Sequence, residues 1–179
     1  MRQWKIAVSS ADAAPLTAPI LMIGDVASNL RKAGAMGFDA IEVHTREDAE
    51  LDYEGIAKAA AESGCKGGMV ITGRLNTEGK CDLISDIPYI TAAAIDGMKQ
   101  YVDMAQKVGA EGLVIGWVKG NVPAGGDRTK YMNRLAKNLK VLNDYAKAKN
   151  VKLNIEVINR YEVNVFTTAE ETMTFLEAH

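Results

Sequence analysis

The stretch KLNIEVINRYEVNVFTTAEE, residues 152–171, contains a strand-like run with a carboxylate, Glu156, placed among apolar residues. In an extended strand, successive side chains point to opposite faces of the sheet. Leu153, Ile155 and Val157 therefore share one side, where a layer of helices would cover them. Glu156 points to the opposite side, so the alternation predicts a sheet with a polar group on its second face.

The same succession of a strand-like and a helix-like segment is repeated along the chain. Short β-branched runs alternate with segments whose apolar residues recur at helical spacing. Asp25, Asp52 and Thr168 stand where N-caps are expected, and Glu171 would complete a capping box with Thr168. We predict strands at 4–10, 39–45, 67–73, 112–118 and 151–159, and helices at 25–38, 52–64, 91–110, 128–150 and 167–179.

Strands that are separated by helices run parallel, and a parallel sheet needs cover on both faces. A doubly wound open sheet and a (β/α) barrel both meet this requirement. A dinucleotide-binding open sheet would carry G-x-G-x-x-G after its first strand, and none is present there. The stretch GRLNTEGKC (73–81) is not a phosphate-binding loop, because it has five residues between its glycines and Cys81 after the lysine.

The second strand favours the barrel. In DAIEVH (39–44), Ile41 and Val43 oppose Glu42 and His44, so polar side chains again lie on one face near a strand's end. Such barrels carry their chemistry at the carboxyl ends of the strands. We interpret Glu42 and His44 themselves as a hydrogen-bonded structural pair. The predicted class is α/β, a parallel (β/α) TIM-barrel type with about five of the eight βα units.

Composition narrows the choice of partners. The 21 basic and 23 acidic residues give a formal net charge of −2, with no basic run that would release phosphate counterions. We therefore expect no nucleic-acid partner, and no membrane partner either, since no segment approaches the roughly 18 apolar residues of a membrane span.

Cys65 and Cys81 form no C-x-x-C pair and have no metal-type spacing. We expect reduced thiols and a cytoplasmic location.

The segment IEVINRYEVNVFTTAEETMTFL (155–176) resembles the fifth-strand signature of the xylose-isomerase-like barrel family. The resemblance is to the branch of ketose 3-epimerases and 5-keto-gluconate epimerases, whose members carry a glutamate, two or three residues, NRYE and a threonine before the next helix. Two upstream stretches resemble family segments in matching order, KAGAMGFDAIEV (32–43) and AIDGMKQYVDMAQKVGAEGLVIGWVKG (94–120). The resemblance covers nearly the whole chain.

This resemblance implies a metal-dependent sugar isomerase or epimerase that takes a proton from the carbon alpha to a carbonyl and passes through an enediolate. Family members hold one divalent cation with two glutamates, an aspartate and a histidine from four strand ends. Glu156 matches the first of these ligands, and that glutamate also exchanges the proton, so it is both metal ligand and catalytic residue. Glu162, in NRYE, matches a carboxylate that hydrogen-bonds sugar hydroxyls. Oxygen ligands favour Mn²⁺ or Mg²⁺, and one imidazole allows Co²⁺ or Zn²⁺.

Each of these residues also has a structural interpretation. Glu156 could pair with Arg160 or with a lysine of a neighbouring strand, and Glu162 could be a solvated loop acid. Trp117, at the end of the fourth predicted strand, could pack in the core or bind substrate by stacking on a sugar face.

Five βα units leave the first and fifth strands with unpaired edges, which invite pairing with another chain. We expect that residues 1–179 are one barrel domain, C-terminally incomplete, in a protein about 100 residues longer. We also expect a homo-oligomer, or a second chain over the open edges, and catalysis of a small-molecule sugar only with the missing strands. The alternatives are a non-catalytic sugar-binding or regulatory half-barrel and a multi-zinc phosphodiester-cleaving relative, against which two histidines argue.

Overall fold

Six parallel strands form one sheet in the computed structural model, which describes residues 4–179. Their order is β2-β1-β3-β4-β5-β6. The strands span Ala7–Ala11 (β1), Met22–Ile23 (β2), Ala40–His44 (β3), Lys66–Ile71 (β4), Gly112–Ile115 (β5) and Lys152–Ile155 (β6). The helices span Val26–Ala35 (α1), Tyr53–Ser63 (α2), Gly73–Thr77 (α3), Pro88–Val108 (α4), Arg128–Ala148 (α5) and Ala169–Ala178 (α6), with a 3-10 turn at Trp117–Lys119 (η1). The predicted α/β class with parallel strands is confirmed.

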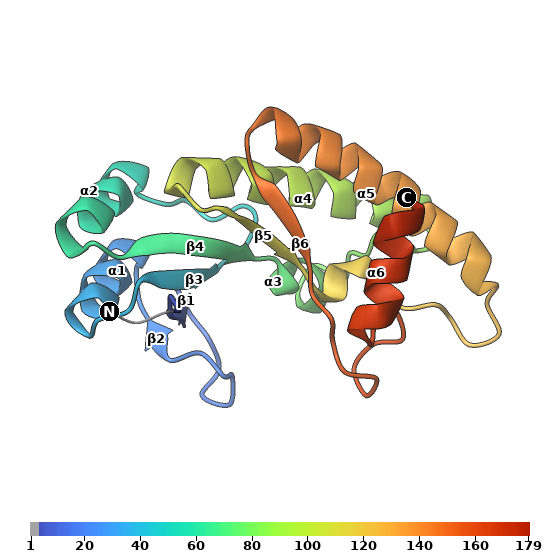
Figure 1. Ribbon diagram of the computed structural model, residues 1–179, viewed down its shortest axis with the longest axis horizontal. Coiled ribbons are helices and arrows are strands. Elements are labelled where there is room, and N and C mark those ends of the chain that lie inside the picture. The colour runs from blue at the N-terminus through green and yellow to red at the C-terminus, as the bar shows by residue number, and fades with distance from the viewer. Residues whose placement is uncertain (1–3) are drawn as a thin grey trace.

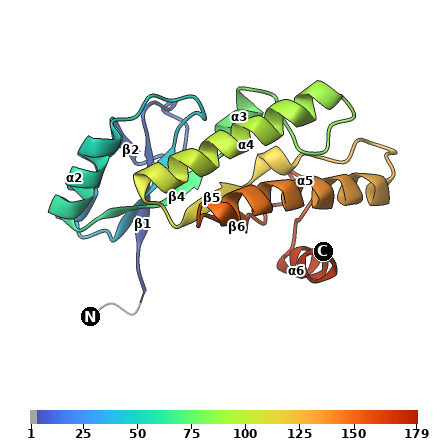
Figure 2. The same ribbon diagram turned by 90° about the horizontal axis from the view of Figure 1, so that it is seen from above.

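One continuous layer of helices covers the sheet. Figure 1 shows α4 and α5 over the strands β4 to β6, with α1 and α2 continuing the layer towards β1. In sequence order, α1 packs against α2, α2 against α4 and α4 against α5. Seen from above in Figure 2, α4 and α5 lie side by side. This is the arrangement in which each helix connects two parallel strands and returns across the same face.

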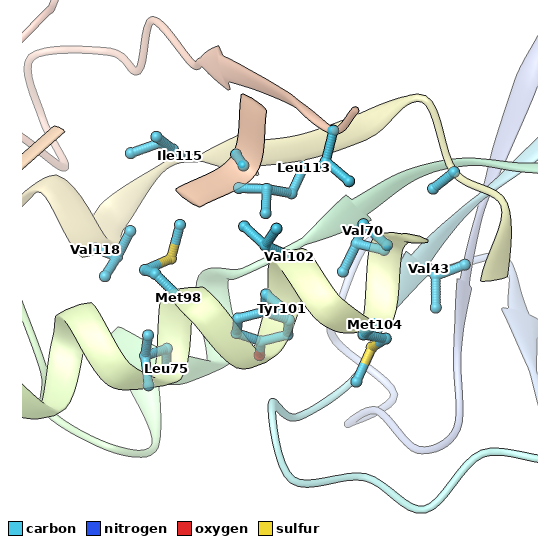
Figure 3. Close-up of a cluster of buried hydrophobic side chains, with 14 of the residues drawn as sticks. Val43, Val70, Leu75, Met98, Tyr101, Val102, Met104, Leu113, Ile115 and Val118 are labelled. Atoms are coloured by element: carbon cyan, nitrogen blue, oxygen red, sulfur yellow. The ribbon is translucent and has the colours of Figure 1, made fainter. Parts of the chain in front are cut away.

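The core lies between this helix layer and the sheet. The strand register places Val43, Val70 and Leu113 in one row across β3, β4 and β5, and all three side chains are buried. Figure 3 shows Val102 and Met98 of α4 lying against this row. Burial of these apolar side chains supplies the main free energy of folding.

The predicted helix starts are confirmed at three caps. The side chain of Asp25 accepts a hydrogen bond from the Ser28 amide at 2.8 Å, and that of Asp52 from the Gly55 amide at 2.9 Å. Thr168 accepts from the Glu171 amide at 3.1 Å. The reciprocal half of the predicted capping box is wrong, because the Glu171 carboxylate accepts from the amide of Thr167 rather than Thr168.

The prediction of a fully unpaired first strand is wrong. β2 runs parallel to β1, with Ser10 opposite Met22 and Ala11 opposite Ile23. The two-residue strand was too short to leave a hydrophobic pattern in the sequence. It covers the carboxyl end of the β1 edge.

The last two predicted strands end three or more residues earlier than expected. β5 stops at Ile115, because Gly116 leaves the extended conformation at φ −97° and ψ −115° and the chain enters η1. β6 stops at Ile155, so Glu156 is the first residue beyond it. The side chain of Val157, expected under the helices, is instead 43% exposed. Strand alternation no longer holds past the end of a strand, which is why that prediction is wrong. The predicted loop after β4 also contains α3.

A charged cluster ties the segment before α4 to α5. The carboxylate of Asp86 accepts hydrogen bonds from Lys130 Nζ at 2.8 Å, from the Tyr131 hydroxyl and from Arg134 Nη2 at 2.9 Å. Arg134 also donates to the carbonyl oxygens of Ile84 and Ser85. The hydrogen bonds from Lys130, Tyr131 and Arg134 hold the pKa of Asp86 well below its ordinary value.

We predict that Asp86→Asn lowers the urea midpoint of unfolding near neutral pH and that the difference from the unmodified chain disappears in acid. A carboxyl whose pKa is lower in the folded than in the unfolded state stabilises the fold above the unfolded value and loses that effect below it. The loss should therefore occur as the pH falls below 3.8, the ordinary value for aspartate. Asp96→Asn, on the exposed face of α4, is the matched control. A difference that persists unchanged in acid would contradict the prediction.

No helix within residues 4–179 is long and apolar enough to span a membrane.

Candidate active site

A cavity of about 840 Å³ opens where the strands end. Its lining includes Ala11 and His44, the last residues of β1 and β3, and Ile71, the last residue of β4. Gly116 and Glu156, which directly follow β5 and β6, complete the row. The cavity therefore lies at the carboxyl ends of five parallel strands, the position at which barrels of this type carry their chemistry.

All three residues predicted from the sequence as site residues line this cavity, namely Trp117, Glu156 and Glu162. The indole Nε1 of Trp117 donates to Glu162 Oε2 at 3.1 Å, and Asn159 Nδ2 donates to Glu162 Oε1 at 2.5 Å. Glu162 is an exposed residue, but both its oxygens accept hydrogen bonds, so its carboxylate is held in place. Trp117 is not a core residue either, since its side chain is 38% exposed and lies against Gly73.

Glu156 lies at the junction of β6 with the loop that follows. Its amide donates to the carbonyl oxygen of Ile115 at 3.1 Å, which is the last contact of the β5–β6 ladder. Its carboxylate lies over Gly116: a β-carbon added at that glycine would be 2.6 Å from Glu156 Oε2. Within the described part of the chain, the alternative pairing with Arg160 is not formed.

Lys119 is a residue that the sequence did not single out. It has no exposed surface, and its Nζ donates to the carbonyl oxygens of Gly116 at 3.0 Å and Glu156 at 3.1 Å. Burial lowers the pKa of Lys119 to about 8, while the nearby carboxylates of Glu156 and Glu171 favour its charged form. Lys119 stands between Val118 and Gly120, and lysine is rarely fully buried, so no sequence pattern pointed to this role.

Two further groups lie around the cavity. Nε2 of His44 is 3.9 Å from Glu42 Oε2, beyond hydrogen-bond range, so the predicted pair is in contact but not hydrogen-bonded. The interaction with His44 lowers the pKa of Glu42 against the effect of partial burial. Arg74 of α3 also lines the cavity and binds Asp12 at 2.7 Å and Glu78 at 2.6 Å. Arg74 is thus already neutralised by two carboxylates.

The donor set for a metal ion is incomplete. Residues 4–179 contain no group of three or more His, Cys, Asp or Glu side chains placed to hold a cation. A carboxylate is a suitable ligand for Mn²⁺ or Mg²⁺. Within residues 4–179, the Glu156 carboxylate accepts no hydrogen bond, so its oxygens are available to a cation. Glu156 therefore fits the role of one ligand, and the other ligands would have to come from elsewhere.

Comparison with known proteins gives consistent matches. The family model for the xylose isomerase-like TIM barrel matches residues 30–179. An L-ribulose 3-epimerase of Mesorhizobium japonicum is 29% identical over 152 residues, covering 84% of this chain and 48% of that protein. An L-ribulose 3-epimerase of Methylomonas sp. is 27% identical over 147 residues, covering 81% of this chain and 50% of that protein.

Solved structures give the same architecture. A D-allulose 3-epimerase of Methylomonas sp. matches with a TM-score of 0.68 and 25% identity, covering 86% of this chain and 54% of that one. A structure of an L-ribulose 3-epimerase matches in fold with a TM-score of 0.73 and 23% identity, covering 95% of this chain and 56% of that one. The chain spans about half the length of the curated relatives that it matches.

Proposed function

Because this chain belongs to the xylose isomerase-like TIM barrel family, we propose that it forms part of a sugar isomerase or epimerase acting on a ketose or keto sugar acid. The observation that carries the proposal is the meeting of Glu156, Glu162 and Trp117 in one cavity at the carboxyl ends of parallel strands. Matches to two L-ribulose 3-epimerases and a ketose 3-epimerase of Arthrobacter globiformis support the substrate class.

In the proposed reaction, Glu156 removes the proton from the carbon alpha to the sugar carbonyl, which leaves an enediolate. Glu162, fixed by Trp117 and Asn159, accepts hydrogen bonds from sugar hydroxyls. Trp117 offers its partly exposed ring to an apolar face of the sugar. A divalent cation held by Glu156 and by ligands outside the described residues, Mn²⁺ or Mg²⁺ and alternatively Co²⁺ or Zn²⁺, would stabilise negative charge on the sugar oxygens.

The proposal includes a partner for the open side of the site. We propose that residues 1–179 are one barrel-type domain and that the remaining βα units pair with the free edge of β6. They would be supplied by a longer chain or by a second chain, and the alternative for the free edge is edge-to-edge pairing with another copy. Matches that cover only 48% and 50% of the two L-ribulose 3-epimerases support this view. We also propose a cytoplasmic location, where the free thiols of Cys65 and Cys81 would stay reduced.

A chimera tests the function. Residues 1–179 would be joined to the remaining C-terminal part of the Methylomonas sp. D-allulose 3-epimerase and incubated with D-allulose and Mn²⁺ in D₂O. We expect deuterium to enter the sugar at the carbon next to the carbonyl, detected by mass spectrometry, and to stop entering when the cation is chelated. A chimera with a cooperative unfolding transition but no exchange, with either D-allulose or a keto sugar acid, would contradict the proposal.

A second candidate function is a sugar-binding half-barrel that performs no chemistry. The lack of a three-ligand metal group within residues 4–179 favours this alternative for the isolated chain. Binding of D-allulose to the 179-residue chain, followed through the indole ¹⁵N resonance of Trp117, together with no exchange by the chimera, would favour it over the enzyme.

A further inference from the structure

The polar contacts of Lys119 join the ends of two neighbouring strands. Its ammonium group donates to the carbonyl oxygen of Gly116, directly after β5, and to that of Glu156, directly after β6. Removing a lysine from water is costly unless its charge is hydrogen-bonded. Because Lys119 has no exposed surface, these two bonds have to persist for the charged side chain to stay in the fold.

The two hydrogen bonds of Lys119 lie just beyond the last backbone hydrogen bond between β5 and β6. The amide of Glu156 still pairs with the carbonyl of Ile115 at 3.1 Å, and the register of β5 with β6 ends at the pair Ile115 and Ile155. Beyond this point, the Lys119 ammonium joins the segments after β5 and β6 in place of backbone hydrogen bonds. It therefore acts on the backbone of the one residue whose side chain is proposed to react.

Gly116 lies against the carboxylate of the same residue. A β-carbon at this position would stand 2.6 Å from Glu156 Oε2, closer than real contacts allow. The carboxylate occupies the space that a side chain would fill. The glycine and the lysine thus act on opposite parts of Glu156, its carboxylate and its carbonyl.

Further along, the same two segments are joined again. The amide of Asn164 donates to Asn121 Oδ1 at 2.7 Å, and the amide of Val122 donates to Asn164 Oδ1 at 2.9 Å. With the bond from Trp117 to Glu162, these bonds join the segment after β5 to the segment after β6 at several points. The turn η1, gold in Figure 1, is therefore a support for the loop that carries the site.

We propose that Lys119 and Gly116 are positioning residues that hold the Glu156 carboxylate in one orientation towards the cavity, an inference that rests on the proposed role of Glu156. Lys119 does not line the cavity, and Gly116 lines it without a side chain. Lys119 fixes the backbone from which the side chain departs, and Gly116 leaves the room in which the carboxylate lies.

The test measures the side-chain conformation of Glu156 by NMR in the 179-residue chain, with neither metal nor sugar present. In the unmodified chain, the three-bond couplings between Hα and the two Hβ protons should report one χ1 rotamer. Lys119→Met, which keeps the length of the apolar stem, should average these couplings and lower the protection of the Glu156 amide from exchange by about tenfold or more. Lys140→Met, the same change at an exposed lysine of α5, should leave both unchanged.

Two results would overturn the inference. The first is an averaged rotamer of Glu156 in the unmodified chain, which needs no variant to detect. The second is a folded Lys119→Met chain with the couplings and the amide protection of the unmodified one. If Lys119→Met does not fold, the same couplings are measured in Gly116→Ala. The added methyl group should move the Glu156 side chain to a different rotamer, and unchanged couplings would contradict the proposal. These readouts involve no catalysis, so their failure is distinct from a failure of the proposed function, which only the exchange experiment reports.

Discussion

Glu156→Gln in the chimera is expected to lower the rate of deuterium exchange by about 10²–10⁴-fold, the usual contribution of a positioned general base. Glutamine has nearly the same shape as glutamate, but its amide cannot take a proton from carbon. The backbone contacts of residue 156 with Ile115 and Lys119 involve its amide and carbonyl groups, so they should survive the substitution. The loss should therefore be chemical and should leave the fold unchanged.

The sugar should still bind to the Glu156→Gln chimera through Glu162 and Trp117, which are untouched and hold each other. Because Glu156 is also a proposed metal ligand, both chimeras are compared at Mn²⁺ concentrations that saturate each of them. A fall in exchange with a nearly unchanged dissociation constant for D-allulose would separate proton transfer from binding. Glu177→Gln, the same change on the exposed surface of α6, is the control and should keep the full rate. If Glu156→Gln exchanges deuterium as fast as the unmodified chimera, Glu156 is not the base.

Leu113→Ala in the 179-residue chain is expected to lower the free energy of unfolding by about 2–5 kcal/mol, the range for truncating a fully buried leucine. Leu113 has no exposed surface and lies in the middle of β5, against Val102 of α4 (Figure 3). The loss is large compared with the total stability of about 5–15 kcal/mol of a typical domain.

Urea denaturation followed by circular dichroism would measure the effect of Leu113→Ala as a shift of the midpoint at an unchanged slope. Leu16→Ala is the matched control, because Leu16 is fully exposed and its truncation should change the stability little. A Leu113→Ala chain that is as stable as the Leu16→Ala chain would show that β5 is not at the centre of the core.

Much of the fold could be predicted because its causes are local. The caps at Asp25 and Asp52 are single side chains next to the amides that they bind, so a short stretch of sequence contains both partners. Strand alternation, which also depends on neighbours alone, correctly put Leu153 and Ile155 on the core side of β6. The same rule failed for Val157, because β6 ends at Ile155, and Glu156 reaches the cavity from the first position after that strand.

Parts of the site could not be predicted because they join residues far apart in the sequence. The bond between Trp117 and Glu162 links positions 45 residues apart, and the neutralisation of Arg74 by Asp12 spans 62 residues. Sequence reasoning left the roles of Trp117 and Glu162 open for that reason. It gave no reason to mention Arg74, which lies on a helix, α3, that was predicted as a loop.

The sequence by itself determined the alternation of strands and helices, the parallel direction of the strands, most helix starts and the family resemblance, since each depends on residue type and spacing along the chain. Only the tertiary structure decided which polar groups meet at the strand ends and which charge is buried. Lys119 illustrates the difference. The local sequence around it predicts an exposed loop, yet the fold places its ammonium between the carbonyls of Gly116 and Glu156. A buried charge is tolerated only where polar groups converge on it. The carbonyl of Glu156 is 37 residues from Lys119 in the sequence, so this convergence exists only in the folded chain.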